Sequence, residues 1–263
     1  MPILALGGDM MVRLQSGVSL LLPWLDVLAL LSWGSLLLKY YATGQLRLLI
    51  HPNYAILTTI TGFVLLMVGC FRGLRLVRDR RKSAMMADFP HFTLLPPGVG
   101  MGLLATVAIA GLLIPPKVLS SDTALQRGIS DTLPITQTAV ESFYNPTPPE
   151  ERSLIDWVRT LNAYPEPDAY TDQAVNVTGF VVHPPELPDD YILVARFIIT
   201  CCAVDAYPVG LPVKVGDREE YPADDWLTVK GVMATETFES RRQLVIAPED
   251  LETIPTPADP YEF

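Results

Sequence analysis

The sequence contains only three histidines and three cysteines among 263 residues, and few of them lie near one another. Cys201 and Cys202 are adjacent, but no CxxC spacing and no second cluster of cysteine and histidine accompanies them. Zinc fingers depend on such repeated spacing, so that class of site is excluded. No serine–histidine–aspartate order, paired-carboxylate motif or glycine-rich phosphate loop stands out, and we therefore expect no enzyme.

The C-terminal part of the chain is poor in positive charge. Nine basic and four acidic residues precede Pro115, whereas ten basic and 25 acidic residues follow from Pro115 onward. Nucleic-acid binding requires Lys and Arg to neutralise phosphates, so this acidic part is expected not to bind nucleic acid. An acidic domain tolerates cations more readily than anions. The charge distribution predicts a basic, apolar N-terminal part joined to an acidic C-terminal part.

Long apolar runs are confined to the N-terminal part. Three of them, 18–41, 54–71 and 92–114, are predicted to cross a bilayer, which requires roughly 20 apolar residues. The first run is longer than the apolar region of a signal peptide and no clear cleavage site follows it, so we expect it to be retained. Residues 1–114 are therefore predicted to form a membrane domain with three transmembrane helices.

The orientation is predicted from the basic residues between the second and third runs. Short segments rich in Lys and Arg stay in the cytoplasm, and the densest cluster of positive charge extends from Arg72 to Lys82. This cluster predicts a cytoplasmic N-terminus and an extracytoplasmic location for everything after Ile114.

Asp26 is the one ionisable residue well inside a predicted span. A carboxylate at the centre of a bilayer costs on the order of 2.5–3.5 kcal/mol, so it normally faces the interior of a protein. Two interpretations stay open. Asp26 makes an intramembrane contact with another helix, or it lies towards the cytoplasmic half of the bilayer and binds water or a backbone donor.

Residues 115–148 are rich in Ser, Thr and Pro and are predicted to be a linker. Residues 149–263 then begin with a predicted helix, whose apolar face is formed by Leu154, Ile155, Trp157, Val158 and Leu161. Five short apolar segments separated by polar turns follow, at 174–183, 191–202, 207–215, 225–236 and 242–254. Five such strands predict a small, mainly-β, OB-like barrel.

The adjacent cysteines end the second of these strands, where successive side chains point to opposite faces. On a regular strand Cys201 shares the buried face with Phe197, whereas Cys202 lies nearer solvent. Both thiols can hold one thiophilic metal ion, together with Asp205 and with His183 if it lies close enough, only if the strand breaks at Cys201. Three interpretations stay open: buried structural thiols, a metal contact, and a redox pair or strained disulfide.

Several segments of the chain resemble the YcgQ-like family of predicted permease subunits: "HPNY", "IPPKVLSSDTALQRG", "RFIITCCAVDAYPVG" and "DWLTVKGVM". The likeness covers most of the chain. It implies a bacterial membrane protein with a C-terminal β domain and with a permease as its companion subunit. On the matching positions, the signature residues of the family are Arg196, Phe197, Cys201, Cys202, Asp205 and Gly210.

Together these features predict the accessory subunit of a membrane permease, held in the inner or plasma membrane, whose acidic outer domain gates the transporter or presents a cation to it. The alternative is a membrane-anchored protein that handles a metal ion or redox equivalents through Cys201 and Cys202. The expected partners are the lipid bilayer and the permease. A thiophilic metal ion is the one cofactor that the cysteines suggest.

Overall fold

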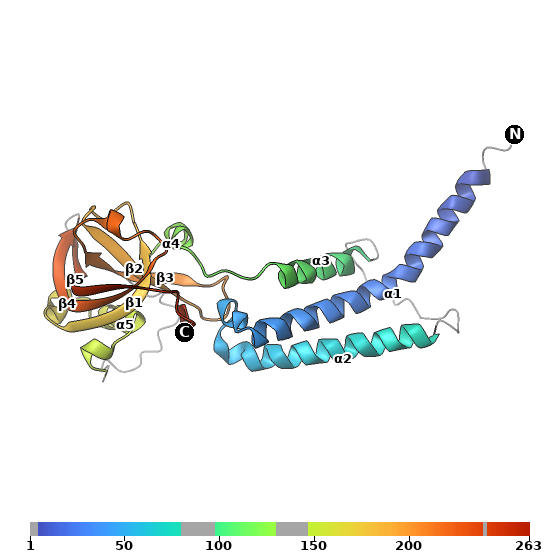
Figure 1. The fold of residues 1–263 in the computed structure, drawn as a ribbon, viewed down its shortest axis with the longest axis horizontal. Helices are drawn as coiled ribbons and strands as arrows, with labels where there is room; N and C mark the ends of the chain where they lie inside the picture. The colour runs from blue at the N-terminus through green and yellow to red at the C-terminus, as the bar shows by residue number, and fades with distance from the viewer. Residues whose placement is uncertain (1–4, 80–97, 130–146, 239–240) are drawn as a thin grey trace. The chain divides into compact units, whose positions relative to one another are not determined.

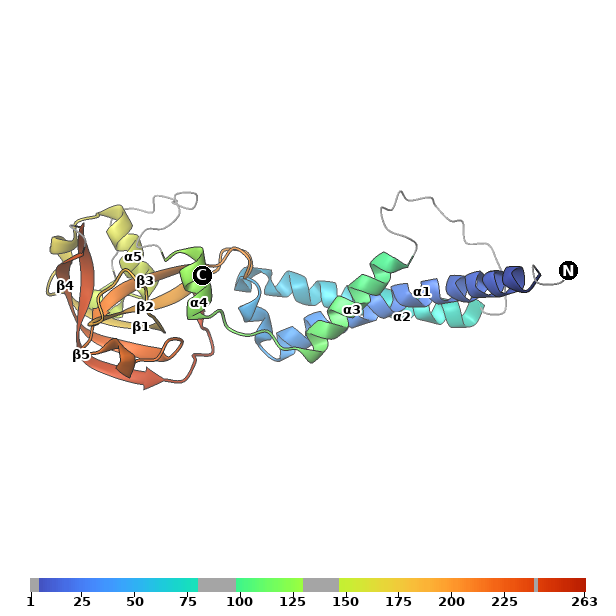
Figure 2. The same cartoon turned by 90° about the horizontal axis from the view of Figure 1, so that it is seen from above.

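The structure is a computed structural model that describes residues 5–79, 98–129, 147–238 and 241–263, with side chains described from residue 22 onward in the first helix. The chain divides into two compact units, Met1–Pro116 and Lys117–Phe263. The first unit is helical, and the second is built around a β-sheet (Figures 1 and 2).

The described part of the first unit contains three α-helices: α1 (Ala5–Ala42), α2 (Ala55–Asp79) and α3 (Val99–Leu113). Helices α2 and α3 each pack along α1. Two 3-10 turns, η1 (Gln45–Leu48) and η2 (Pro52–Tyr54), connect α1 to α2. Glycines allow α1 and α2 to approach closely, because a Cβ atom on Gly34 would lie only 2.9 Å from the carbonyl oxygen of Gly62.

Two helical segments, Leu22–Ala42 and Pro52–Arg78, are long and apolar enough to cross a membrane. The third predicted span is wrong. Within the described part of 92–114 the helix covers only the 15 residues of α3, which corresponds to about 22 Å, whereas the hydrocarbon core is roughly 30 Å thick. Gly98, with a φ of 85°, precedes the helix, and Pro115 and Pro116 follow it, so it does not extend at either end. Residues 92–97 lie outside the described residues.

The sequence places the basic cluster in a loop between two spans, but part of the cluster lies on a helix. Helix α2 continues to Asp79, so Arg72, Arg75 and Arg78 lie on its last turns. Arg and Leu, which make up most of residues 72–78, are strong helix formers, and they continue the helix beyond the apolar run. The remaining basic residues, 80–82, lie outside the described residues. The orientation in a membrane stays a prediction.

The second unit begins with helix α4 (Ser121–Arg127), which lies inside the interval predicted to be a linker. Residues 130–146 of that interval lie outside the described residues. The next helix, α5 (Leu154–Ala163), is present, but it begins at Leu154 and not near Pro149 as predicted. Ser153 and Asp156 form a reciprocal capping box at its N-terminus, which fixes where it begins. Short 3-10 helices flank α5 at η4 (Pro149–Glu151) and η5 (Pro167–Tyr170).

The described strands form one six-stranded mixed sheet in the order β1-β4-β5-β3-β2-β6. Their bounds are β1 (Ala174–Val182), β2 (Tyr191–Ile198), β3 (Tyr207–Lys214), β4 (Trp226–Phe238), β5 (Arg241–Ile254) and β6 (Tyr261–Glu262). The first five correspond to the five predicted strands, and β6 was not predicted. Strand β1 also pairs with β2, so the pairings among the first five strands return to their starting point.

Two parallel pairings complete this otherwise antiparallel sheet. Strand β5 joins β3 through the pair Ile246 and Val213, and β6 joins β2 through a short ladder that includes Tyr261 and Phe197. The β4–β5 ladder contains a bulge at Gly231. A Cβ atom at this position would lie 2.2 Å from the carbonyl oxygen of Ala247, so only glycine allows the two strands to approach this closely.

The core of the second unit is formed by helix α5 and the first five strands. Leu154 and Trp157 of α5 are almost completely buried among apolar side chains from β1 to β5. Ile155 and Val158, on a neighbouring part of the helix surface, pack against Ile198 at the end of β2. Helix α5 thus holds the end of β2 from which the two cysteines follow.

Candidate functional site

Strand β2 ends at Ile198, before the two cysteines, and a tight loop over 200–205 follows it. The expectation that Cys201 lies in the core is therefore wrong: Cys201 is exposed and Cys202 is half-buried. The chain turns here, and the Asp205 N–H donates to the carbonyl oxygen of Cys202 at 3.0 Å. The strand thus breaks ahead of the thiols, as a site formed by both cysteines requires.

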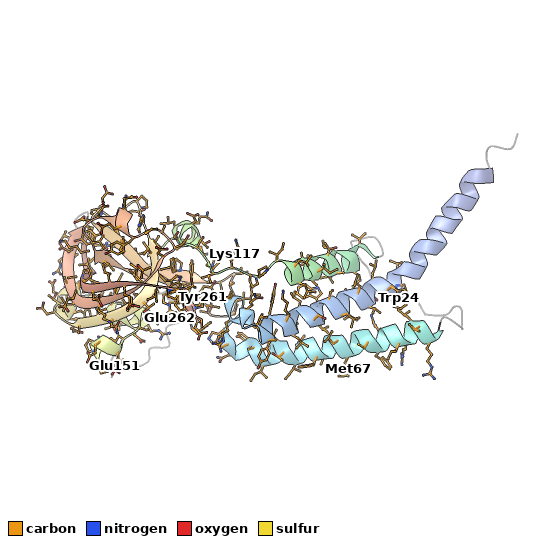
Figure 3. The ribbon with its side chains drawn as sticks, in the orientation of Figure 1. Trp24, Met67, Lys117, Glu151, Tyr261 and Glu262 are labelled. Atoms are coloured by element: carbon orange, nitrogen blue, oxygen red, sulfur yellow. The ribbon has the colours of Figure 1, made fainter. Side chains whose placement is uncertain are left out.

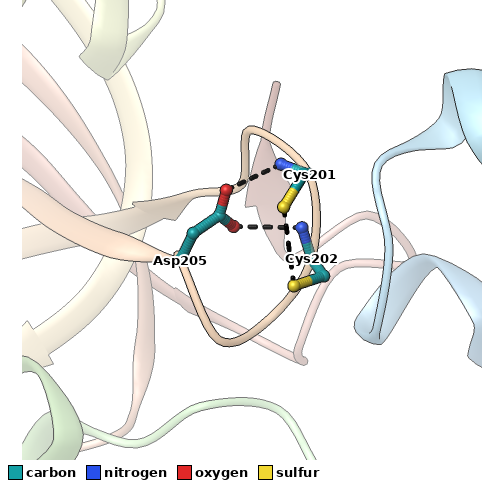
Figure 4. Close-up of side chains that lie close together, drawn as sticks. All are labelled: Cys201, Cys202 and Asp205. Carbon is teal, nitrogen blue, oxygen red and sulfur yellow. Dashed lines mark hydrogen bonds between the residues drawn. The ribbon is translucent and has the colours of Figure 1, made fainter. Parts of the chain in front are cut away.

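The carboxylate of Asp205 holds the loop together. Its Oδ2 accepts from the Cys201 N–H at 2.8 Å, and its Oδ1 accepts from the Cys202 N–H at 3.0 Å (Figure 4). Oδ2 also accepts from the Thr200 hydroxyl. Asp and Thr commonly bind nearby backbone in this way, which explains why this segment turns instead of continuing the strand. Burial opposes the charge on Asp205, but the hydrogen bonds outweigh it and lower the pKa of the carboxyl group to about 2.

The broken strand brings the two thiols together. The Sγ atoms of Cys201 and Cys202 are 3.6 Å apart, and these atoms and a carboxylate oxygen of Asp205 all lie within 4.8 Å of one another. The hydrogen bond to Asp205, and next that to Cys202, raises the pKa of the Cys201 thiol to about 11. His183 is not part of this group, because its Nε2 is hydrogen-bonded to the carbonyl oxygen of Tyr221 at 2.9 Å.

Arg127, at the end of α4, braces the loop from a distant part of the chain. Its guanidinium donates to the carbonyl oxygen of Ala203 at 3.3 Å and also to that of Ala206. Between these two carbonyls, Val204 is 86% exposed at the tip of the loop. Sequence reasoning missed this contact, because nothing within α4 itself indicates which loop its arginine reaches.

Arg196, a predicted signature residue, forms an ion pair beneath the loop with Glu262 of β6, with a distance of 3.4 Å between Nη1 and Oε1. The two side chains are only 15% and 11% exposed. The guanidinium also donates to the carbonyl oxygen of Asp259 and lies 5.6 Å from the centre of the Trp226 ring. Burial lowers the pKa of Arg196 and raises that of Glu262, while their mutual attraction opposes both shifts.

Glu262, labelled in Figure 3, links three elements at the base of the loop. Its carboxylate accepts from the Ser153 hydroxyl at 3.2 Å and from the Ile155 N–H at 3.3 Å, both at the N-terminus of α5. Its backbone carbonyl accepts from the Ile199 N–H at 3.0 Å, immediately after β2 ends. Sequence reasoning did not identify Glu262, and two residues of strand are too short to show a period.

Phe197 and Gly210, the other two predicted signature residues, have packing roles. Phe197 is fully buried and stacks on Phe180, with ring centres 5.4 Å apart. A Cβ atom on Gly210 would lie 2.9 Å from the carbonyl oxygen of Val194 and equally close to Leu193. A larger residue there would push β3 away from β2 and so displace the strand ends that carry the loop.

In the first unit, Asp26 of α1 contacts Arg72 of α2, with a distance of 3.2 Å between Oδ2 and Nη1. Of the two interpretations left open for Asp26, the structure shows the interhelical contact. The pair borders a cavity of about 320 Å³ lined by α1, α2 and α3, whose walls are otherwise apolar and include Trp33 and Met101. The Trp33 Nε1–H donates to the carbonyl oxygen of Leu104 at 3.0 Å, which ties α1 to α3.

Comparison with known proteins identifies the family. Residues 25–130 match the DUF1980 N-terminal domain, and residues 150–263 match the DUF1980 C-terminal domain. The chain therefore belongs to the DUF1980 family and carries both of its domains. Neither the comparison with curated proteins nor that with solved structures gives a match. The family descriptions name neither the YcgQ-like proteins nor a permease, so that part of the prediction stays a prediction.

Proposed function

We propose that this protein is a membrane-anchored accessory subunit of a transport system, which captures a thiophilic metal ion at Cys201 and Cys202 and presents it to a permease. The observation that carries this proposal is the loop after β2, which places both thiols 3.6 Å apart on an accessible part of the second unit. Soft metal ions prefer sulfur ligands. The acidic composition of residues 115–263 adds a long-range attraction for cations.

Membrane anchoring is supported by the length and composition of Leu22–Ala42 and Pro52–Arg78. Helix α2 also presents large apolar side chains that the chain itself leaves uncovered, including Met67, which is 67% exposed and is labelled in Figure 3. Such a surface needs lipid or the helices of another protein to cover it. We place the basic end of α2 in the cytoplasm, in accordance with the positive-inside rule. A location of the second unit outside the cytoplasm would require a third crossing, for which the 15 residues of α3 are too short.

A permease partner follows from the small number of candidate spans. Secondary transporters form their pathways between repeats that each contain several membrane helices. The described part of this chain offers two segments long enough to cross a bilayer. We therefore propose that the ion crosses the membrane through a second protein, and that the helical unit binds to that protein.

We further propose that the sheet of the second unit is a small barrel of the OB type. The ring of pairings supports this, because β1 pairs with both β4 and β2, while β4 continues through β5 and β3 back to β2. Fold alone does not define the function. In this chain the fold matters because it fixes the ends of β2 and β3, between which the cysteine loop lies.

Full-length protein in detergent, incubated with Zn²⁺ or Cd²⁺ and then desalted, should retain one metal ion per chain. Loss of an outer-shell contact already weakens metal binding by about 10–100-fold, so Cys201→Ser and Cys202→Ser should each weaken it at least as much. Elemental analysis by mass spectrometry measures the retained metal. Cys70→Ser is the matched control, since it removes the thiol of α2 and should leave retention unchanged. Undiminished retention by the Cys201→Ser/Cys202→Ser double variant would contradict the proposal.

A redox role is the second candidate, and the short distance between the two Sγ atoms favours it. Adjacent Cα atoms are about 3.8 Å apart, whereas disulfides usually need roughly 4.4–6.8 Å, so a bond between these neighbours would be strained. Thiol counting on the same preparation, before and after reduction, separates the two roles. A disulfide in freshly isolated protein would favour redox chemistry, and two free thiols with bound metal would favour the metal role.

Affinity purification of the full-length chain from bacterial membranes in mild detergent should recover a multispanning transporter in comparable amount. A chain lacking Lys117–Phe263 should still recover it, because we expect the helical unit to provide the binding surface. An established membrane complex of the same cells serves as the control for the detergent. Recovery of the chain without a transporter, in a detergent that keeps the control complex assembled, would argue against the permease partner.

A further inference from the structure

We infer that Cys201 and Cys202 hold the ion as an open two-sulfur chelate, that Asp205 positions the loop without binding the ion, and that the free coordination positions accept a thiol from a donor or acceptor molecule. This inference rests on the proposed function and specifies the ligands and the mode of transfer at the same site. It also removes Asp205 from the predicted ligands.

The carboxylate of Asp205 is already engaged in hydrogen bonds within the loop. An ionised carboxylate has about four acceptor positions. Three are used by the N–H groups of Cys201 and Cys202 and by the Thr200 hydroxyl, and in the metal-free chain the Cys201 thiol donates to the same carboxylate. Turning the carboxylate towards an ion would release the backbone of the same two residues that carry the sulfur atoms. The loop would then lose the contacts that bring the sulfurs together, so positioning and ligation by Asp205 are in conflict.

The distance between the two sulfur atoms suits a single metal ion. With metal–sulfur bonds of about 2.3 Å, as for zinc, a separation of 3.6 Å corresponds to a sulfur–metal–sulfur angle of about 100°. This angle suits two neighbouring positions of a tetrahedral or trigonal ion, such as Zn²⁺ or Cd²⁺. One or two positions then stay open. Structural zinc sites fill all four positions with protein ligands, whereas sites that act on other molecules keep one open.

The sulfur atoms are accessible to other molecules from solvent. Cys201 is exposed, and the neighbouring tip residue Val204 is almost fully exposed, so another molecule can approach the sulfurs from solvent. On the protein side, Arg127 closes the loop by its hydrogen bonds to the carbonyl oxygens of Ala203 and Ala206. The loop is thus fixed to the domain and open outwards, which is the arrangement that an exchange site requires.

Transfer then occurs by ligand exchange without any change of oxidation state. The sulfur of the incoming thiol forms a bond to the ion, and the bond between the ion and Sγ of Cys201 breaks. The proton lost by the incoming thiol passes to the leaving Cys201 thiolate. The same exchange at Cys202 releases the ion, and the reverse sequence loads it. A partner that bears its own cysteine thiol therefore fits this site.

X-ray absorption spectroscopy on the full-length chain in detergent, loaded with Zn²⁺, tests the ligand set. We expect two sulfur neighbours and one or two lighter ones per ion. Addition of glutathione, a monothiol probe, should raise the number of sulfur neighbours to three, and Cys70→Ser should behave as the wild type. Three or four sulfur neighbours before glutathione is added, or no change afterwards, would overturn the open chelate.

Amide hydrogen exchange tests the role of Asp205. If Asp205 positions the loop, the amides of Cys201 and Cys202 stay protected when Zn²⁺ is loaded. If it binds the ion, both amides lose their acceptor and exchange at least about tenfold faster after loading, which would overturn the inference. Asp205→Asn should speed exchange of these amides in the metal-free chain, yet leave two sulfur neighbours in the loaded chain. Failure of the wild type to retain metal would instead overturn the proposed function itself.

Discussion

Replacing Arg196 with methionine should lower the free energy of unfolding of the second unit by about 3–5 kcal/mol. The substitution keeps the length of the side chain but leaves Glu262 ionised and nearly buried without its cation, because both side chains are mostly hidden from solvent. The ion pair also connects β2 to β6, so the loss should extend to the base of the cysteine loop. Urea titration of the detergent-solubilised chain, followed by tryptophan fluorescence, measures the change.

Lys214→Met provides the matched control for this experiment. Lys214 pairs with Glu236 at 3.2 Å, but the two side chains are 50% and 41% exposed. An exposed pair contributes about 0–1 kcal/mol, so the control should have little effect. A similar change in both variants would show that the Arg196 pair contributes no more than a surface contact.

The effect of Arg196→Met should depend on pH in a defined direction. Burial raises the pKa of Glu262 in the folded chain above its unfolded value. A group of this kind stabilises the folded state fully below its unfolded pKa, and the contribution is lost as pH rises through the folded pKa. Arg196 opposes this rise, so Arg196→Met should raise the pKa of Glu262 further, and the variant should lose more stability than the wild type as pH rises. The deficit should therefore be largest at neutral pH and shrink as the solution is acidified and Glu262 is protonated.

Alkylation of Cys201 in the metal-free chain at pH 8 should become roughly 10–100-fold faster in Asp205→Asn. The thiolate is the reactive species, and the hydrogen bond to Asp205 is the largest cause that raises the Cys201 pKa from 9.0 to about 11. An asparagine carries no charge, so the pKa of the thiol should fall and its thiolate fraction at pH 8 should rise. Rates for the Cys201 peptide between pH 7 and 11, read by mass spectrometry, measure the effect.

Asp250→Asn is the control for this second prediction. Asp250 is an exposed carboxylate on β5 that pairs with Lys230, and it should leave the reactivity of Cys201 unchanged. A wild-type alkylation profile with its midpoint near pH 9 would contradict the predicted coupling between Asp205 and the thiol. Agreement with both variants would show that the charge of Asp205 keeps Cys201 protonated at pH 8 in the metal-free chain.

The strands of the second unit could be predicted because their sequence pattern is local. Val175 and Val177 alternate with polar residues in β1, and β2 is an almost continuous apolar run buried on both faces. Helix α5 could be predicted from its apolar face, but its start was placed too early: the prediction began near Pro149, whereas the capping box of Ser153 and Asp156 starts the helix at Leu154. In these elements the local preference of the chain and the final fold agree.

The cysteine loop could be predicted only as one of several alternatives, because its shape depends on distant residues. By itself, the run up to Cys202 resembles an unbroken strand, and this pattern predicted that Cys201 is buried. The break depends on Asp205, which turns the backbone, and on the pairing of β6 with the end of β2. Helix α4 could not be predicted for a similar reason: seven residues in a segment rich in Ser and Thr carry too little periodicity.

Asp26 and the third apolar run show two further limits of prediction from the sequence. An isolated carboxylate in an apolar segment indicates that a partner is needed, but not that the partner is Arg72 on the next helix. By its number of apolar residues, the third run is long enough to cross a bilayer. Its helix is limited by Gly98 at one end and by Pro115 at the other, and counting apolar residues does not take account of such breaks.

The bracing of the cysteine loop has a consequence for the order in which the protein matures. Arg127 precedes the cysteines in the chain, whereas Glu262 follows them after four intervening elements, β3, the 3-10 helix η6 (Arg218–Glu220), β4 and β5. During synthesis, Cys201 and Cys202 therefore emerge before the strand that closes the base of their loop. We expect the nascent chain to bind metal poorly until β6 pairs with β2, so that only the finished domain acquires its ion.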